Sequence, residues 1–515
     1  MNKKTAANAA AVIEIGTNNV RMRVSQLSKG TVSLLDSLEY PLRLGYDVFE
    51  TGTVSFDSLR ELSSVLRKFS SALLTYNIQK PKVISCTALR DAKNRSLVID
   101  QLRVRNDLDV TVLDDSQEKA YIYSEIATKL KDADCLKTGN SVIAYVGSGS
   151  IGIAVYDGAK ILYFQNISIG ALKLYEVLHR MRNVARDFHT VVEEYLDTVL
   201  NRIAISEFPI QNLILTGSQI DLVARLCGAK CEKNYYQFGT ERLSELYGSL
   251  RSLTPEAIGT RYGIKEQDAA ILYTALAIYQ AMLRFSPNTK TVCAPTADIS
   301  EAVIRCMLSS KADTERIAYF RKSALACART TAQRFGCDLK HSQYIRDCSC
   351  HIFDKLKHIH GLDPSKRLIL ELASILHSCG SFVSVRQHNQ CTFNLIQDMD
   401  LFGLSKAEAL EVAFVTGSIS DRLSIEENPE FARLSNKEKL VVSKLAAIFR
   451  IANALDKSHR EKLQNLKVSI EEDRVLFKAA VSSDTLLEQW AFAESAQFFK
   501  DVFGLSPELS IKFEL

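Results

Sequence analysis

This sequence lacks the features that would place it in a specialised class of protein. It has no excess of one charge, because 64 Lys and Arg stand against 60 Asp and Glu, a net charge of +4 over 515 residues. Nucleic-acid binding is therefore not expected. It has no low-complexity segment and no short-period repeat. With 46% hydrophobic and 24% charged residues, it is globular, which excludes disorder, collagen and a coiled-coil rod.

An export signal and a membrane span are also missing. The apolar stretch near the N-terminus is rich in alanine and is stopped by Glu14, so it makes a poor signal-peptide core. The longest uncharged run, 269–283, contains Thr274 and Gln280 and is too short to cross a bilayer. It predicts a buried helix instead. We expect a cytoplasmic protein without membrane contact.

The twelve cysteines form no Cys-x-x-Cys pair. Cys348, Cys350 and His351 have a spacing that resembles a metal site, but on a helix these three side chains point in different directions. We expect reduced thiols that pack as small apolar side chains.

Strand and helix patterns alternate in the first part of the chain. Two β-rich runs flank the polar turn 16–19, and a helical stripe of apolar residues follows at 58–76. A second strand–turn–strand unit surrounds the turn 147–150, and a further strand ends at Gly217. This pattern predicts two related α/β lobes.

Helical stripes dominate from about residue 310, and strand-like segments return near the C-terminus. The length of the chain agrees with three to four domains. The sequence therefore predicts lobe I at 1–135, lobe II at 136–309, a helical domain at 310–435 and a C-terminal helical and strand extension at 436–515.

The two glycine turns are candidate phosphate-binding loops. A turn between strands can direct successive backbone N–H groups at one point, and glycine lets an anion approach closely. One such turn alone is usually an ordinary hairpin. Two of them, each opening an α/β lobe, favour phosphate binding between the lobes. The candidate residues are Gly16, Thr17, Asn18, Asn19, Gly147, Ser148, Gly149, Ser150 and Gly217.

Several segments resemble the exopolyphosphatase/guanosine pentaphosphate phosphohydrolase (Ppx/GppA) family. The segment AAVIEIGTNNVRMRV resembles its first phosphate loop and SVIAYVGSGSIGIAV its second. LRLGYD, ISCTALRDAKN, ISIGALKL and LILTGS resemble further family segments. The resemblance implies two actin-like (ribonuclease H-like) lobes, a helical HD-type domain and a small C-terminal α/β tail.

The resemblance also implies roles for two charged residues. Glu118, in LDDSQEKAYIY, takes the place of the glutamate that activates water in the family motif G-x-E-E-A, with Gln117 at the neighbouring acidic position. A capping box formed by Asp115 and Glu118 at a helix start is the alternative. Arg90 takes the place of a phosphate-contacting arginine, and a guanidinium holds two phosphate oxygens at once.

Departures from the family pattern affect magnesium, the cofactor that the resemblance implies. The first-loop aspartate is replaced by Glu14, the one weak candidate for a metal ligand. The two second-loop acids are replaced by Tyr145 and Gly152. Magnesium normally takes one or two carboxylates together with substrate oxygens and water. Their loss weakens the expectation of metal-dependent hydrolysis.

The helical part resembles an HD-type domain that has lost ligands. His341 and His377 stand at matching places, but Ser378 replaces the aspartate of the His-Asp pair. His388 remains, and a later histidine has become Cys391. A histidine in an apolar helix is usually a satisfied core residue, so we expect no catalytic metal here.

The leading hypothesis is a phosphohydrolase that removes terminal phosphates from inorganic polyphosphate or guanosine pentaphosphate. The alternative is a catalytically weakened protein of the same family that binds polyphosphate or an alarmone nucleotide, such as guanosine pentaphosphate or tetraphosphate. An actin-like ATP-dependent activity has no positive support in the sequence. The resemblance also implies a homodimer.

Overall fold

The computed structural model describes residues 8–131, 133, 139–179, 187–232, 234–251, 253–418 and 428–513. It divides into two compact units, Met1–Ser323 and Ala324–Leu515. The division falls inside helix α13 (Ser310–Arg334), whose first residue is the predicted start of the helical domain. The predicted boundary between residues 135 and 136 lies outside the described residues. The two units are described separately.

Lobe I of the first unit is built on a five-stranded sheet with the order β3-β2-β1-β4-β5. Strands β1 to β3 form an antiparallel meander, and β4 and β5 run parallel to β1. Helix α2 buries the predicted stripe of Leu59, Leu62, Leu66, Phe69 and Leu73, which confirms the helix expected there. The elements are β1 (Ala9–Ile15), β2 (Asn19–Ser28), β3 (Thr31–Pro41), α1 (Leu44–Thr51), α2 (Phe56–Leu73), β4 (Lys82–Ser85), α3 (Thr87–Asp91), α4 (Arg95–Asn106), β5 (Val110–Val112) and α5 (Asp115–Lys129).

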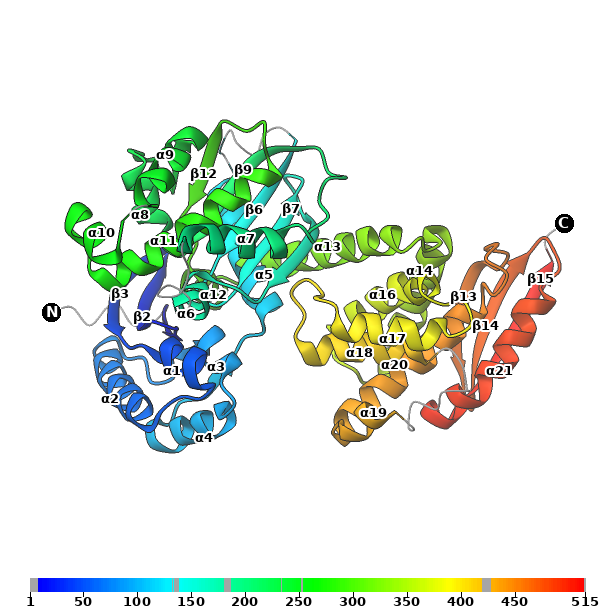
Figure 1. Ribbon diagram of the computed structural model, residues 1–515. Coiled ribbons are helices and arrows are strands. Elements are labelled where there is room, and N and C mark those ends of the chain that lie inside the picture. The colour runs from blue at the N-terminus through cyan, green and yellow to red at the C-terminus, as the bar shows by residue number, and fades with distance from the viewer. Residues whose placement is uncertain are drawn as a thin grey trace. The chain divides into compact units, whose positions relative to one another are not determined.

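Lobe II is built on a seven-stranded sheet with the order β10-β11-β12-β9-β6-β7-β8. Strands β6, β9 and β12 run parallel to one another, and β6, β7 and β8 form an antiparallel meander. The uncharged run 269–283 lies mainly in α11, which is buried in the core of this lobe (Figure 1). The elements are β6 (Asn140–Val146), β7 (Ile151–Tyr156), β8 (Ile161–Ile167), α6 (Ala171–His179), α7 (Phe188–Leu200), β9 (Ile210–Gly217), α8 (Ile220–Leu226), β10 (Cys231–Glu232), β11 (Tyr235–Gly239), α9 (Thr240–Leu250), α10 (Pro255–Tyr262), α11 (Glu266–Met282), β12 (Thr291–Pro295) and α12 (Ile299–Leu308).

Two helices connect the lobes by packing against elements distant in sequence. Helix α12 follows lobe II but packs against β1, β2 and α5. Helix α5 belongs to lobe I in sequence, yet its Tyr123 packs edge-on against Phe164 of β8. Both helices therefore lie where the two lobes meet.

The second unit combines a group of helices with a small sheet. The strands have the order β13-β14-β15, and α21 packs against β15. Figure 1 shows this sheet and α21 in orange and red. None of the described helices combines the length and the apolar character that a membrane-spanning segment needs. The elements are α14 (Leu339–Lys355), α15 (Lys357–His360), α16 (Lys366–Leu376), α17 (His388–Asp398), α18 (Lys406–Gly417), α19 (Pro429–Arg433), α20 (Asn436–Ala454), β13 (Gln464–Glu471), β14 (Arg474–Val481), α21 (Leu486–Phe503) and β15 (Ser506–Phe513).

Candidate active site

Both glycine turns join paired antiparallel strands, as predicted. Ile15 pairs with Val20 across the first turn, and Val146 pairs with Ile151 across the second. Each turn is closed in the same way, because the N–H of its first glycine donates to the carbonyl three residues later at 2.9 Å. The two loops thus repeat one backbone arrangement, one in each lobe.

A second glycine supports each loop from behind. The N–H of Gly45 donates to the carbonyl of Thr17 at 2.7 Å, and a Cβ on Gly45 would lie 2.8 Å from the Thr17 side chain. Gly170 lies so close to the second loop that a Cβ would be 2.4 Å from the carbonyl oxygen of Gly147. Only glycine permits these approaches without a shift of the backbone. Both glycines were missed as site residues in the sequence, although the segments LRLGYD and ISIGALKL contain them.

These supports orient the loop amides. The carbonyls of Gly147 and Ser148 accept hydrogen bonds from the start of α6 at 2.9 and 3.0 Å. In a trans peptide the carbonyl and the following N–H point in opposite directions. The N–H groups of Ser148 and Gly149 therefore point away from α6. The same relation turns the N–H of Asn18 away from Gly45.

Three other predicted loop residues have structural contacts. The side chain of Asn19 donates to Glu39 of β3 at 2.5 Å, which holds it within lobe I. A Cβ on Gly149 would lie 2.2 Å from Thr87 in α3, so the second loop reaches lobe I at this point. Gly217 has a φ of +111° and approaches the carbonyl of Val146, where β6 ends. Gly217 thus shapes the base of the second loop.

Arg90 lies at the centre of the site, at the end of the short helix α3. It donates to Glu118 at 2.9 Å and to Asp115 at 2.8 Å, and also to Thr87 and to the carbonyl of Leu113. Burial lowers the pKa of Arg90, but Glu118 and Asp115 outweigh this effect and raise it. The guanidinium is therefore permanently charged and is aimed at the start of α5.

Glu118 is not part of the helix cap. The capping box at the start of α5 is formed by Asp114 and Gln117, and Gln117 accepts the backbone N–H of Asp114 at 3.2 Å. The alternative box of Asp115 and Glu118 is therefore wrong by one residue. This shift leaves the Glu118 carboxylate, 5% exposed, to bind Arg90 and to face the Tyr145 hydroxyl at 3.4 Å.

A buried lysine was missed in the sequence. Lys119 is fully buried, and its ammonium group donates to Asp115 and to the Ser150 hydroxyl. Burial raises the pKa of Asp115, but Lys119 and Arg90 outweigh that and hold it below its usual value. The sequence contains a signal for this lysine. When the alanine of the family motif G-x-E-E-A is aligned with Ala120, the two acidic positions of the motif fall on Glu118 and Lys119. Lys119, and not Gln117, is then the neighbouring acidic position.

Lys119 packs against Gly152 and Tyr145, the two positions where the family resemblance leads us to expect acids. Gly152 and Tyr145 pair directly across the β6–β7 hairpin. A Cβ on Gly152 would lie 2.8 Å from Cγ of Lys119, and the Lys119 ammonium lies 5.6 Å from the centre of the Tyr145 ring. Burial and the nearby Glu118 raise the pKa of Tyr145 well above its ordinary value, so it stays protonated.

Glu14 lies at the end of β1 and accepts a hydrogen bond from Ser300 of α12 at 2.6 Å. Burial and the neighbouring Asp298 raise its pKa to about 7. Its charge is therefore only partly present at neutral pH.

The residues present do not fit a magnesium ion. Magnesium needs free, charged oxygen ligands in octahedral geometry. Glu118 is paired with Arg90, Asp115 is paired with Arg90 and Lys119, and the pKa of Glu14 is raised to about 7. Within the described ranges, no group of three His, Cys, Asp or Glu side chains is arranged to hold a metal ion. Magnesium at Glu14 stays a prediction of the family resemblance.

In the second unit, the histidines of the expected HD-type domain are bonded to protein groups. His341 bonds to Asp456 at 2.7 Å, and His377 bonds to the carbonyl of Ser374 at 2.8 Å. His388 bonds to the carbonyl of Val385 at 3.0 Å. Asp456, which also accepts two backbone N–H groups, was not foreseen as a partner.

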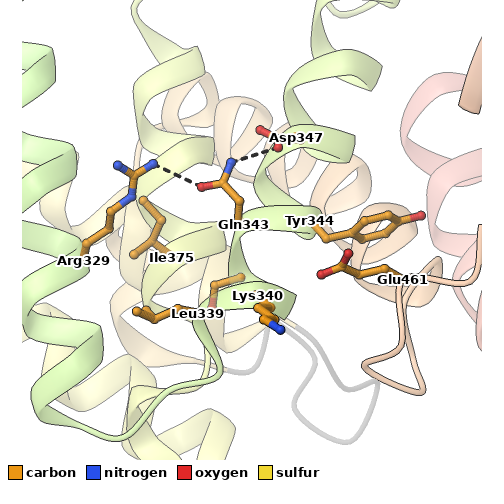
Figure 2. A pocket seen from close by; sticks show the side chains of 9 residues that line it. Arg329, Leu339, Lys340, Gln343, Tyr344, Asp347, Ile375 and Glu461 are labelled. Carbon is orange, nitrogen blue, oxygen red and sulfur yellow. Dashed lines mark hydrogen bonds between the residues drawn. The ribbon is translucent and has the colours of Figure 1, made fainter. Parts of the chain in front are cut away.

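The second unit also contains a cavity of about 420 Å³, which Figure 2 shows. A chain of hydrogen bonds runs along it from Arg329 to Gln343 at 3.1 Å and from Gln343 to Asp347 at 2.8 Å. None of the predicted site residues lines it.

Comparison with known families identifies the protein class. A model of the Ppx/GppA phosphatase family matches residues 23–298, which is more than half of the chain. A model of Ppx/GppA phosphatase domain III matches residues 325–495. The chain belongs to the Ppx/GppA phosphatase family. The match to domain III assigns the second unit to this family as well.

Solved structures support the fold of this Ppx/GppA phosphatase. A family member from Aquifex aeolicus is 19% identical, with a TM-score of 0.50, and the match covers 59% of this chain and 98% of the other. An exopolyphosphatase from Cytophaga hutchinsonii is 20% identical, with a TM-score of 0.53, and the match covers 58% of this chain and 97% of the other. At these identities, the likeness shows a shared mixed α/β fold.

Proposed function

We propose that this Ppx/GppA phosphatase removes terminal phosphates from a condensed phosphate, either inorganic polyphosphate or guanosine pentaphosphate. The observation that carries the proposal is the convergence of Arg90 and Glu118 beside the glycine loop 147–150, where the two lobes meet. Positive charge, loop amides and a carboxylate are the groups that phosphoryl transfer to water needs. The name of the Cytophaga protein, an exopolyphosphatase, supports the same reaction class.

Each group has a distinct role in the proposed reaction. The N–H groups of Ser148 and Gly149, together with Arg90, hold the oxygens of the terminal phosphate. Glu118 accepts a proton from water as the water oxygen attacks phosphorus. The bond from phosphorus to the bridging oxygen breaks, which releases inorganic phosphate and a chain shortened by one phosphate.

Substrate entry must change the contacts of Arg90. In this structure Arg90 uses its N–H groups on Glu118 and Asp115. Phosphate oxygens compete for the same donors, because bidentate Arg–phosphate pairs are strong. An arginine that turns toward phosphate frees the Glu118 carboxylate to bind water. The paired state is thus a resting state of the proposed site.

A second candidate function is binding of the same condensed phosphates without turnover. The specific observation that favours it is the pairing of Lys119 with Asp115 and Ser150, beside Tyr145 and Gly152 in place of two acids. A site with internally paired charges can bind phosphate yet stabilise the transition state weakly.

The cytoplasmic location expected from the sequence stays a prediction. The homodimer that the family resemblance implies also stays a prediction.

One experiment tests the proposal and separates the two candidates. Phosphate release is measured from long-chain polyphosphate and from guanosine pentaphosphate, with magnesium or manganese added, for the wild type and Glu118→Gln. Removal of a general base lowers turnover by about 100-fold or more. Glu61→Gln, which changes an exposed carboxylate of lobe I, is the matched control and keeps wild-type turnover. Equal turnover by Glu118→Gln refutes the role of Glu118, and binding without any turnover selects the second candidate.

A further inference from the structure

Lys119 occupies the part of the site where two acids of the family pattern have been replaced. Its side chain lies over Gly152, where a Cβ would come within 2.8 Å of Cγ of Lys119 and 2.5 Å of the Tyr123 hydroxyl. A glutamate at position 152 would therefore collide with Lys119. Lys119 fits here only because residue 152 has no side chain, so the two residues form one arrangement and differ from the loss of a single ligand.

The ammonium group of Lys119 has the surroundings that a bound cation would have. It contacts the carboxylate of Asp115 and the hydroxyl of Ser150, and it lies near the face of the Tyr145 ring. Asp115 also binds Ser150 at 2.8 Å, so the carboxylate, the hydroxyl and the ammonium group form one closed set. These are oxygen ligands and an aromatic face, which stabilise a positive charge without water.

We propose that Lys119 is a built-in cation that takes the place of a divalent metal ion, so that this site binds condensed phosphate without magnesium. The inference rests on the proposed phosphate site and adds its ion requirement. Lys119 acts as a positioning residue: it donates to Ser150, which belongs to the second phosphate loop, and it adds one fixed positive charge behind that loop. A polyanion that enters the site then contacts Arg90, while Lys119 acts on it from behind the loop through Ser150.

Lys119 supports the second phosphate loop and also carries a positive charge. Two substitutions separate these effects. Lys119→Met keeps most of the side-chain volume and removes the charge. Lys119→Ala also opens space next to Asp115 and Ser150, which are oxygen ligands of the kind that magnesium takes. The matched control is Lys129→Met, because Lys129 is a mostly buried lysine of the same helix that binds Glu301 of α12 at 2.8 Å and does not contact the loops.

The test is the affinity of the full chain for inorganic tripolyphosphate, measured by calorimetry with EDTA and again with magnesium. We expect the wild type and Lys129→Met to bind equally well in both buffers, within about twofold. Lys119→Met is expected to bind about tenfold more weakly in both buffers. Lys119→Ala is expected to bind weakly in EDTA and to recover affinity when magnesium is added, a response that a merely structural role for Lys119 does not produce.

Three results overturn the inference. The first is a wild type that binds tripolyphosphate only with magnesium, and the second is wild-type affinity in Lys119→Met. The third is equal affinity of Lys119→Ala in the two buffers. Binding by no variant in either buffer refutes the proposed phosphate site itself, and the inference with it. Binding that depends on magnesium refutes the inference alone.

Discussion

Substitution of Gly152 by alanine tests the packing of Lys119 most simply. The new Cβ would lie 2.5 Å from the Tyr123 hydroxyl and 2.8 Å from Cγ of Lys119, whereas ordinary contacts begin at 3.4 Å. The far end of Lys119 is held by Asp115 and Ser150, so the side chain cannot move away without stretching those contacts. Overpacking of a core costs about 1–3 kcal/mol. We expect Gly152→Ala to destabilise the first unit by about 3 kcal/mol, at the upper end of that range.

The assay must report on the first unit. Trp490 is the single tryptophan and lies in the second unit, so tryptophan fluorescence does not follow the unfolding of the first. Denaturant unfolding followed by far-ultraviolet circular dichroism reports on both units, so the part of the transition that Trp490 fluorescence does not follow belongs to the first unit. Gly248→Ala is the matched control, because Gly248 lies inside α9 and its added Cβ would meet no described atom within 4 Å apart from its chain neighbours and the backbone of its own helix. Helix propensity predicts a gain of about 0.5–1 kcal/mol there.

A double-mutant cycle isolates the contact with Lys119. When Lys119→Ala is made first, Gly152→Ala should cost about 1–2 kcal/mol less, because Cγ of Lys119 is gone while the Tyr123 contact remains. Two results refute the reasoning. One is a Gly152→Ala protein within about 0.5 kcal/mol of the wild type, and the other is a cycle in which the two costs simply add.

Two further predictions concern Arg90 and His377. Arg90→Lys should weaken tripolyphosphate binding about tenfold, because a lysine does not contact Glu118, Asp115 and phosphate with one planar fork. Arg103→Lys on the exposed surface should leave the affinity unchanged, and an unchanged affinity for Arg90→Lys would refute the role of Arg90. Burial and the nearby His341 lower the pKa of His377 to about 3, below its unfolded value, so the unfolded state binds a proton first as the pH falls. The free energy of unfolding of the second unit should therefore fall by about 2 kcal/mol between pH 7.5 and pH 5, as measured by denaturant unfolding followed by Trp490 fluorescence. His377→Gln should remove this pH dependence, and an equal fall in the variant would contradict the role of His377.

Local patterns predicted the elements of the site better than their contacts. Glycine between two β-rich runs was enough to predict both hairpins, and the apolar spacing at 58–76 was enough to predict α2. The start of helix α5 was also expected, but the capping box considered as the alternative role of Glu118 lies one residue too late. Asp114 and Asp115 are equally good caps by residue type, and only the backbone conformation distinguishes them.

The contacts that the sequence did not reveal link distant segments. Gly45 and Gly170 support the loops from other parts of the chain, and nothing in their local sequence indicates which backbone they approach. Lys119 is a more instructive case. On a helix, a lysine is normally exposed, and its burial follows from the absence of a side chain at Gly152. Restoring acids at Tyr145 and Gly152 alone is therefore not expected to create a metal site while Lys119 is present.

Hydrogen–deuterium exchange, measured with and without inorganic tripolyphosphate, locates the bound phosphate directly. If condensed phosphate binds between lobes I and II, backbone amides in the two loops 16–19 and 147–150 should exchange more slowly in its presence. The same protection should appear in EDTA, because Lys119 supplies the cation. Protection confined to residues 324–515, or no protection at all under conditions of saturating ligand, would contradict a phosphate site at the glycine loops.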